Sequence, residues 1–168
     1  MIIRDECPDD VAAIRDVLLA AFPTDVEARL VEALRAAKRL LVSLVAEDAG
    51  RIVGHIAFSP VRVNTFPANT GGVGLAPLAV IPDYQQRGIS GQLVRDGLAA
   101  CARAGYDFAV VLGEPGYYSK FGFTPASQYG LGNEYGVDDE FMLLALCAGG
   151  IPTTHGMVRY APEFALVA

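Results

Sequence analysis

The segment from residue 74 to residue 112 constrains the fold most strongly. Its apolar pattern predicts a strand over 74–80, a helix over about 88–104 and a second, buried strand over 106–112. Strands joined through a helix pair in parallel, and such crossovers are almost always right-handed. Because Pro77 cannot donate a ladder hydrogen bond, we expect the first strand to leave its neighbour at that point. The chain must therefore contain a mixed α/β layer with an interrupted strand.

Shorter elements are predicted on both sides of this segment. Pro8 opens a first helix, and a second helix begins near Thr24. Strands are predicted at the N-terminus and over the following ranges: 40–46, 51–59, 142–146 and 157–160. The resulting order is β-α-α-β-β-β-α-β-α-β-β, which is typical of a mixed α/β domain.

Composition and charge exclude several functional classes. The 168 residues are 52% hydrophobic and 19% charged, so we expect one globular domain over residues 1–168. A net charge of −6 without a basic stripe argues against a nucleic-acid partner. No apolar run reaches the roughly 18 residues that span a bilayer, and residues 1–6 lack the order of a signal peptide. We therefore expect a cytoplasmic protein without membrane contact.

The cysteines indicate neither disulfides nor a metal site. Cys7, Cys101 and Cys147 are odd in number and far apart. That spacing argues against a disulfide framework, and no clustered Cys/His pattern indicates zinc. We expect no bound metal.

The informative motif is the polar turn between the strand and the helix. Pro82 ends the strand, and the helix starts at glycines, Gly88 and Gly91. A helix N-terminus offers backbone N–H groups to phosphate, and glycine allows close approach. The motifs GxxxxGK[ST] and GxGxxG are both absent. From spacing alone, a phosphate site and an ordinary strand–helix turn remain equally open.

Two motifs resemble the GCN5-related N-acetyltransferase (GNAT) superfamily. Its acetyl-coenzyme A signature is [RQ]-x-x-G-x-[GA] after a strand L-x-V-x-P. Here Leu78, Val80, Pro82, Gln85 and Gly88 match, whereas the sixth position is Ser90, with Gly91 one residue later. The second motif, Y-x-x-x-G-F, is met over residues 118–123. The stretch 111–118 is similar to a bacterial subgroup of predicted small-molecule acetyltransferases.

This resemblance implies a fold and a cosubstrate. The fold is that of acyl-CoA N-acyltransferases: a mixed, mostly antiparallel sheet of about seven strands, splayed in the middle and flanked by about four helices. The cosubstrate is acetyl-CoA, with its pantetheine arm along the splayed strand and its pyrophosphate on the turn. The implied cofactor-binding residues are Leu78, Ala79, Val80, Gln85, Gln86, Arg87, Gly88, Ser90 and Gly91. Many members are dimers, so a homodimer is a candidate state.

The resemblance also implies catalytic residues. Tyr118 takes the family's role of general acid, protonating the departing thiolate; the alternative is a half-buried tyrosine bonded to a carbonyl. The strand 74–81 carries no acid. Glu114 is then the best-placed carboxylate for deprotonating an amine, or else simply an acid stabilised by a helix dipole.

Three other features have two interpretations each. Glu27 can line the substrate side or complete a capping box that begins at Thr24. His55 can relay a proton with Ser59, although a lone strand histidine is more often structural. The stretch 124–140 lacks periodicity and is acidic. It is either a binding loop for a cationic amine or a solvated, mobile connector.

Three functional hypotheses follow. The main one is an acetyl-CoA-dependent N-acetyltransferase in which a primary amine of a small molecule or peptide attacks the thioester directly in a ternary complex. The second is a non-catalytic acyl-CoA-binding sensor or interaction module. The third is a structural α/β domain whose glycine turn binds nothing.

Overall fold

The chain divides into two compact units. The computed structural model describes residues 1–167. The first unit comprises Met1–Ser59, Ala76–Gly97 and the segment from Pro162 onward, and the second comprises Pro60–Leu75 and Leu98–Ala161. One helix and two strands contribute residues to both units. A single domain over residues 1–168 stays a prediction.

One sheet holds the strands that the structure describes. It has nine strands in the order β1-β2-β3-β4-β5-β8-β6, with β9 paired to β3 and β7 paired to β9. The strands are β1 (Ile2–Asp5), β2 (Val42–Asp48), β3 (Arg51–Val63), β4 (Gly72–Val80), β5 (Phe108–Leu112), β6 (Thr124–Pro125), β7 (Leu131–Asn133), β8 (Phe141–Ala145) and β9 (Gly156–Tyr160).

Four α-helices and five short 3₁₀ helices complete residues 1–167. They are α1 (Val11–Ala21), α2 (Val26–Ala36), α3 (Ile89–Arg103), α4 (Pro115–Tyr118), η1 (Pro8–Asp10), η2 (Pro82–Tyr84), η3 (Ser119–Phe121), η4 (Ala126–Tyr129) and η5 (Pro162–Leu166). The mixed α/β class, the mostly antiparallel sheet and the four helices are confirmed. None of the helices described in this range is long and apolar enough to cross a bilayer.

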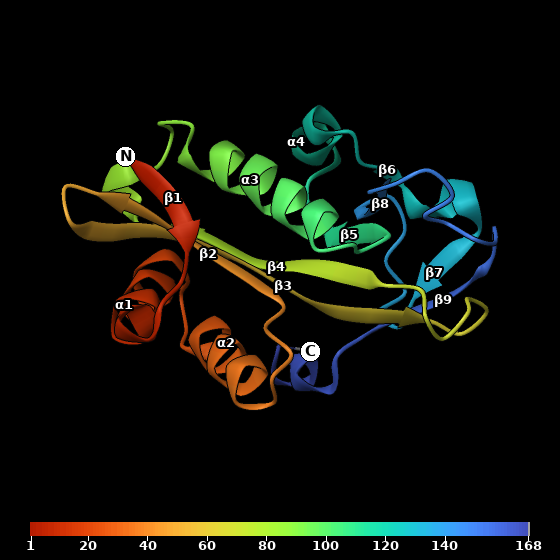
Figure 1. Cartoon of the computed structure of the whole chain (residues 1–168), viewed down its shortest axis with the longest axis horizontal. Coiled ribbons are helices and arrows are strands. Elements are labelled where there is room, and N and C mark those ends of the chain that lie inside the picture. Colours follow the sequence, from red (N-terminus) through yellow and green to blue (C-terminus); the bar gives the residue numbers. More distant parts are fainter. Residues whose placement is uncertain (168) are drawn as a thin grey trace. The chain divides into compact units, whose positions relative to one another are not determined.

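In the first unit, helices cover both faces of the sheet. β1, β2 and the first part of β3 pair antiparallel, with Val45 opposite His55. α1 and α2 lie on one face, and the first part of α3 lies on the other (Figure 1). Because β3 is covered on both sides, Ile56 and Ala57 are both fully buried. The long apolar run of this strand follows from that double burial.

The crossover from β4 through α3 to β5 is parallel, as predicted. Its register is Gly72 opposite Phe108, Val73 opposite Ala109 and Gly74 opposite Val110. Among the described residues this ladder covers only the start of β4, and Pro77 follows soon after its last pair. The predicted departure of the strand from its neighbour is therefore confirmed. The hand of the crossover stays a prediction.

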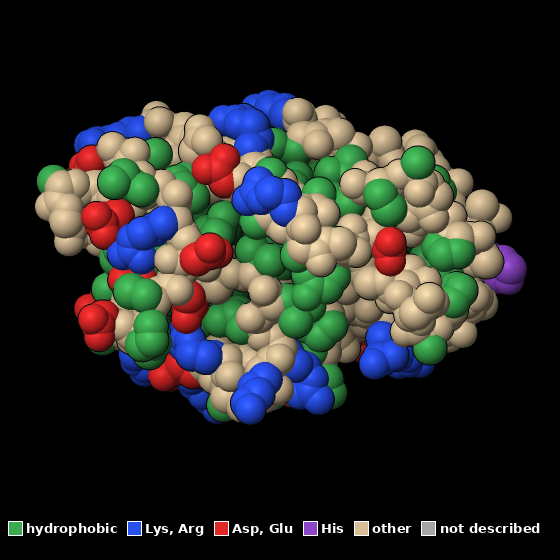
Figure 2. All heavy atoms as spheres, in the orientation of Figure 1, with side chains coloured by type: hydrophobic (Ala, Val, Ile, Leu, Met, Phe, Trp, Pro, Cys, Tyr) green, Lys and Arg blue, Asp and Glu red, His purple; other side chains and the backbone are tan. Residues whose placement is uncertain are grey.

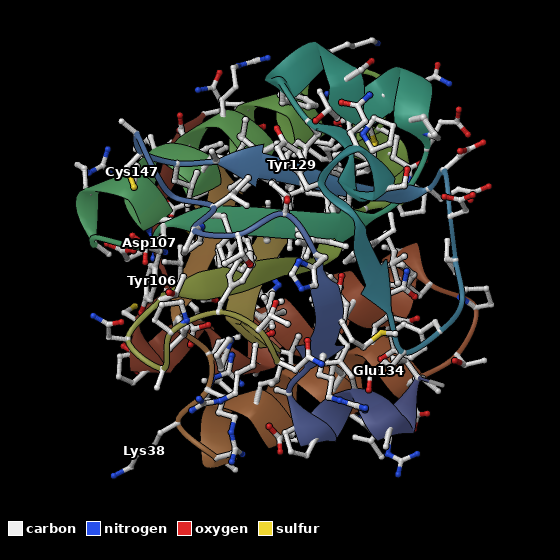
Figure 3. The ribbon with its side chains drawn as sticks, turned by 90° about the vertical axis from the view of Figure 1, so that its right-hand side faces the viewer. Lys38, Tyr106, Asp107, Tyr129, Glu134 and Cys147 are labelled. Carbon is white, nitrogen blue, oxygen red and sulfur yellow. The ribbon has the colours of Figure 1, made fainter. Side chains whose placement is uncertain are left out.

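The start of β4 is fastened to the start of β5 in the second unit. The Asp107 N–H donates to the carbonyl of Gly71 at 2.7 Å, and its carboxylate accepts the Gly71 N–H at 2.6 Å. The Cys147 thiol lies 3.6 Å from the same carboxylate. Figure 3 shows Tyr106, Asp107 and Cys147 side by side at this corner. The clamp fixes the point from which β4 runs toward Pro77.

The stretch 124–140 contains more regular structure than its sequence pattern predicts. It contains β6, η4 and β7, and β7 pairs in parallel with β9. The side-chain amide of Asn133 donates to the Val137 carbonyl at 2.6 Å and accepts the Tyr135 N–H at 2.9 Å. Strands of two and three residues are too short to show a period. The same two strands raise the total from the predicted seven to nine.

Candidate functional site

The turn that joins β4 to α3 is held by Gln85. Its side-chain amide donates to the Val80 carbonyl at 3.0 Å, and its backbone N–H donates to the Pro82 carbonyl at 3.2 Å. The Ile81 N–H donates to Val53 of the neighbouring β3 at 3.0 Å. Gln85 thus holds the turn through one side-chain and one backbone hydrogen bond.

The backbone beyond Gln85 is exposed and left-handed. Gln86 has φ of 62° and Gly88 has φ of 81°, a conformation that glycine adopts freely and other residues adopt at a cost. A Cβ added to Gly88 would have no atom within 4 Å. α3 begins directly afterwards, and the N–H groups of a first helical turn have no intrahelical acceptor. The turn therefore has the local geometry of an anion site.

The strand before this turn is largely buried. Ala79 is 3% exposed and Val80 is 6% exposed, while Leu78 is half-buried. A Cβ on Gly54 of β3 would lie 3.3 Å from the Ala79 carbonyl oxygen, so β3 approaches the β4 backbone closely here. Leu78, Ala79 and Val80 form one continuous segment with the turn in the first unit.

The guanidinium groups of two arginines lie over the Tyr84 ring. The guanidinium carbon of Arg87 lies 4.7 Å from the ring centroid, and that of Arg51 lies 6.0 Å from it. Arg87 was a predicted cofactor-binding residue, whereas Arg51 and Tyr84 were not. Arg51 is the first residue of β3 and is distant from the motif in sequence, so no local pattern indicated it.

Both catalytic candidates lie at α4 in the second unit. Glu114 precedes the helix, and its carboxylate accepts the Gly116 N–H at 3.5 Å. The Tyr118 N–H donates to the Glu114 carbonyl at 3.1 Å. Glu114 is exposed. This geometry agrees with the helix-terminus interpretation of Glu114, and it leaves the carboxylate open to solvent.

Tyr118 is buried among aromatic rings. It is 9% exposed, and its ring meets Tyr117 and Phe123 edge-on at 5.0 and 5.8 Å between centroids. Burial, and then the neighbouring Tyr117, raises the pKa of Tyr118 to about 12. The phenol therefore keeps its proton at neutral pH, as a general acid must.

A second buried tyrosine was not anticipated from the sequence. The ring of Tyr160 fills the space that a side chain at Gly74 would need, because a Cβ there would lie 2.6 Å from the ring. The Tyr160 N–H donates to the Glu134 carboxylate at 2.9 Å, and the Tyr135 ring lies 5.9 Å away between centroids. Burial, with smaller effects of Tyr135, Glu134 and Tyr118, raises the pKa of Tyr160. Figure 3 shows Glu134 at this end of the second unit.

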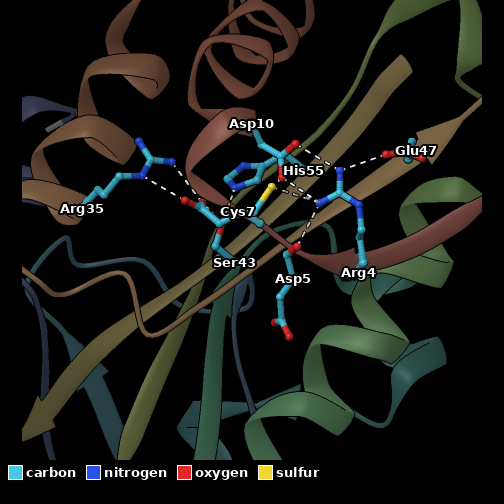
Figure 4. Close-up of polar contacts among 9 residues, drawn as sticks. Arg4, Asp5, Cys7, Asp10, Arg35, Ser43, Glu47 and His55 are labelled. Carbon is cyan, nitrogen blue, oxygen red and sulfur yellow. Dashed lines mark hydrogen bonds and ion pairs between the residues drawn. The ribbon is translucent and has the colours of Figure 1, made fainter. Parts of the chain in front are cut away.

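His55 belongs to a buried polar chain in which its partner is Ser43 and not the expected Ser59. Its Nε2 lies 2.8 Å from the Ser43 hydroxyl, which donates to Glu6, and Arg35 binds the Glu6 carboxylate through two contacts of 3.0 Å (Figure 4). The Glu6 carboxylate is hydrogen-bonded to Ser43 and not to His55. Burial lowers the pKa of His55 to about 4. This favours the structural interpretation over a proton relay.

Neither Glu27 nor Thr24 forms the predicted capping box. α2 begins at Val26 with Asp25 as its N-cap residue, and the Thr24 hydroxyl accepts only the Val26 N–H at 3.4 Å. One Glu27 oxygen is buried and has no hydrogen-bond partner among residues 1–167. The helix starts one residue later than a box at Thr24 requires, so Glu27 is its second residue and not its third.

A cavity in the first unit is lined by more acidic than basic side chains. This cavity of about 660 Å³ is lined by both arginines Arg4 and Arg51 and by five carboxylates, those of Asp9, Asp10, Asp16, Glu47 and Asp83. Arg4 is bound by Asp10 at 2.7 Å and by Glu47 at 2.9 Å (Figure 4). The remaining charge repels phosphate. Nowhere in residues 1–167 do three or more His, Cys, Asp or Glu side chains gather in a way that would hold a metal ion.

Charges on the visible face are mixed. Figure 2 shows Lys and Arg side chains interspersed with Asp and Glu side chains over α1 and α2. That face carries no continuous basic stripe, in agreement with the sequence. Positive charge available to an anion is therefore local, as it is at Arg87.

Comparison with known proteins identifies the family. The model of the Acetyltransferase (GNAT) domain matches residues 3–126. The N-acetyltransferase YhbS of Escherichia coli K12 is 38% identical over 166 residues, covering 98% of this chain and 98% of YhbS. The chain belongs to the GNAT family of acetyltransferases. The resemblance to the GNAT superfamily is thereby confirmed.

Two solved GNAT structures are similar to this chain over nearly its whole length. Crystalline YhbS from Escherichia coli in complex with CoA has a TM-score of 0.91 and 37% identity, covering 98% of this chain and 91% of that one. A GNAT acetyltransferase from Brucella melitensis in complex with acetyl-CoA has a TM-score of 0.79 and 41% identity, covering 97% of each chain. The GNAT fold of this chain is therefore established.

Proposed function

We propose that this GNAT protein transfers an acetyl group from acetyl-CoA to a primary amine of a small molecule or peptide, by direct attack in a ternary complex. The observation that carries the proposal is the exposed, left-handed turn held by Gln85 between an interrupted strand and a helix N-terminus. Family membership makes acetyl-CoA the cosubstrate, and two relatives crystallise with CoA or acetyl-CoA.

The turn binds the pyrophosphate in this proposal. The backbone N–H groups of Arg87, Gly88, Ser90 and Gly91 donate to it, and the dipole of α3 favours its charge. Gln86 is part of the same turn. Ser90, where the family signature has glycine or alanine, adds only a small side chain. The pantetheine arm lies along Leu78, Ala79 and Val80, whose strand is no longer paired with β5.

Chemistry at the thioester needs a polarised carbonyl and two proton transfers. The Val80 N–H polarises the carbonyl, the amine nitrogen bonds to the acetyl carbon, and the carbon–sulfur bond breaks. Tyr118 gives its proton to the departing sulfur and recovers one from the amine as it becomes an amide. Most of the acceleration comes from holding both reactants together.

Glu114 is the proposed base for the incoming amine. An alkylamine has a pKa near 10.4 and must lose a proton before it attacks. Glu114 is exposed and accepts only a long contact from Gly116, so its carboxylate can take that proton directly or through water. Replacing it, Glu114→Gln, removes the base, and turnover then rises with pH as free amine becomes available. A pH–rate profile unchanged from that of the natural protein would leave Glu114 as a helix cap alone.

The acceptor is proposed to be a cation. The stretch 124–140 supports this, because its acidic side chains attract a cation. Glu134 itself is already paired, since its carboxylate accepts the Tyr160 N–H at 2.9 Å and lies 3.9 Å from the Arg159 guanidinium. Panels of alkylamines, aminoglycosides and peptide N-termini separate the acceptor classes.

Calorimetric titration with acetyl-CoA is the first test. The natural protein is expected to bind in the micromolar range, and the variant Arg87→Glu to lose that binding because the charge at the turn is reversed. A folded natural protein that does not bind acetyl-CoA would refute the proposal. Binding without thioester cleavage by any amine would instead favour a non-catalytic acyl-CoA sensor.

The variant Tyr118→Phe tests whether Tyr118 is the general acid. We expect turnover to fall by about 10²-fold, the contribution typical of one general acid, with the Kd for acetyl-CoA unchanged. Thioester cleavage is followed through the released thiol. Unchanged turnover would remove Tyr118 from the mechanism.

A further inference from the structure

Two guanidinium groups converge on one ring beside the turn. Arg87 comes from the turn itself and Arg51 from the first position of β3, and both lie over Tyr84 of η2. A guanidinium that stacks on a ring face keeps its in-plane N–H donors for an anion. Both guanidinium carbons lie within 6.0 Å of the centre of the same ring.

These two arginines, like the exposed Arg29 of α2, differ from four other arginines in the first unit. Arg4, Arg15, Arg35 and Arg39 each form an ion pair with a carboxylate. Within residues 1–167 neither Arg51 nor Arg87 has a carboxylate oxygen within the 4.0 Å of an ion pair, although the chain carries a net charge of −6. The two guanidinium groups repel each other across the ring, and an anion bound to both would relieve that repulsion.

We infer that Arg51 is a second cationic ligand of the acetyl-CoA pyrophosphate, brought to the turn with Arg87 by the Tyr84 ring. The inference rests on the proposed function. It extends the site to a residue that belongs to a different strand from the turn and to no part of the family signature.

The backbone explains how a residue of β3 reaches the turn. β3 and β4 are neighbours in the sheet, and the Ile81 N–H donates to Val53 at 3.0 Å. The start of β3 therefore lies beside the end of β4, where η2 and the turn begin. Arg51 and Arg87 approach Tyr84 from these separate segments.

The cavity beside Arg51 does not offer the phosphate an alternative place. Its carboxylates outnumber its arginines, and Arg4 is already bound by Asp10 and Glu47. Repulsion from that side leaves the turn, with its backbone N–H groups, as the favourable side for a phosphate near Arg51.

Calorimetry on full-length variants tests the inference. Arg51→Ala is expected to raise the Kd for acetyl-CoA about three- to tenfold, the effect of one partly screened charged contact. Arg51→Lys keeps the charge and should recover part of the loss. Arg29→Ala removes an exposed arginine from α2 and should leave the Kd unchanged. Equal affinity of Arg51→Ala and Arg29→Ala would overturn the inference.

Two further measurements exclude a merely structural role. With 3′-dephospho-CoA the loss in Arg51→Ala should persist, because the pyrophosphate is still present; disappearance of the loss would assign Arg51 to the 3′-phosphate and overturn the inference. In the enzyme assay the KM for acetyl-CoA should rise while kcat stays constant. A fall in kcat with constant KM would contradict a binding role.

Tyr84 provides the last control. Tyr84→Phe keeps the ring and should bind acetyl-CoA as the natural protein does, whereas Tyr84→Leu should lose affinity as Arg51→Ala does. Equal affinity of Tyr84→Leu and the natural protein would show that the ring does not gather the arginines. Failure of the natural protein itself to bind would refute the proposed function instead, so the two failures are distinguishable.

Discussion

At the scale of single residues, Gly113 determines where the Tyr118 ring can lie. A Cβ at Gly113 would lie 2.2 and 2.7 Å from two carbons of that ring. Real contacts of this kind do not occur, so a side chain at this position must displace the phenol. The family motif names the tyrosine but not the glycine that makes room for it.

Gly113→Ala is therefore expected to impair catalysis without touching the phosphate turn. Overpacking of a buried ring costs about 1–3 kcal/mol of stability, and the displaced hydroxyl should lower turnover by about 10-fold or more, part of the 10²- to 10⁴-fold that a general acid supplies. The Kd for acetyl-CoA should change less than twofold. Urea unfolding, calorimetry and the thiol-release assay measure the three quantities.

Gly116→Ala is the matched control for this prediction. It lies in α4 with Tyr118, and a Cβ there would meet only a Glu114 oxygen at the ordinary distance of 3.6 Å. Stability should be unchanged or slightly higher, since alanine favours a helix more than glycine does. Equal turnover in the two alanine variants would contradict the role given to Gly113.

At the scale of elements, α3 rests directly on β3 through a second glycine. A Cβ at Gly97 would lie 2.5 Å from the Phe58 ring and 3.5 Å from Ile56. Phe58 is fully buried, so the ring cannot swing into solvent. The height of α3 above the sheet, and with it the position of its N-terminus, depends on this contact.

We expect Gly97→Ala to destabilise the protein by about 1–3 kcal/mol through overpacking, after a gain of up to about 1 kcal/mol from helix propensity. Gly91→Ala in the same helix is the control for stability, because its Cβ would meet only the flexible Arg95 side chain at 3.5 Å. The double variant Gly97→Ala/Phe58→Leu should recover part of the loss. Equal urea midpoints for the two glycine variants would contradict this packing argument.

The elements also show what sequence patterns can and cannot predict. The interruption of β4 was predictable because proline lacks an N–H group, a property of one residue. The strands β6 and β7 were not predictable, because a strand of two or three residues is too short to show the alternation of apolar and polar residues. The capping box at Thr24 was a wrong prediction because the local pattern does not determine which residue starts the helix.

The candidate site likewise contains residues that a sequence pattern can predict and residues that it cannot. The turn from Gln85 to Gly91 is contiguous, so a motif describes it, and Gln85 makes the contacts that hold it. Arg51 and Tyr160 join their sites through β3 and β9, and only strand pairing brings them there. Such residues become visible only once the register of the sheet is known.

At the scale of the whole molecule, one buried histidine should control how folding free energy depends on mildly acidic pH. His55 is fully buried. Burial lowers its pKa to about 4, with Glu6 opposing that effect and Arg35 adding to it. The Ser43 hydroxyl donates to Glu6 and so accepts from His55 Nε2, which fixes the neutral ring with its proton on Nε2. The other ring nitrogen is buried without a partner among residues 1–167.

The direction of this pH dependence follows from which state, folded or unfolded, binds more protons. An unfolded chain protonates its histidines near pH 6.5, whereas the folded chain resists protonation of His55 down to about pH 4. The unfolded state therefore binds more protons in this window, and stability must fall as the pH is lowered through it. The expected loss is on the order of 3 kcal/mol. Below about pH 4.5 Glu6 adds to the loss: burial alone would raise its pKa, but hydrogen bonds from Arg35 and Ser43 lower it overall.

Urea unfolding at several pH values between 6.5 and 4.5 isolates the histidine from the carboxylates. His55→Gln can keep a hydrogen bond to Ser43 but cannot titrate, so its stability should be nearly constant over this window even if it starts lower. The chain has two histidines, and the exposed His155 is the matched control. His155→Gln should retain the full slope of the natural protein. A slope that survives in His55→Gln would place the responsible proton elsewhere, and one lost in His155→Gln would mean that the buried ring is not the group that resists protonation.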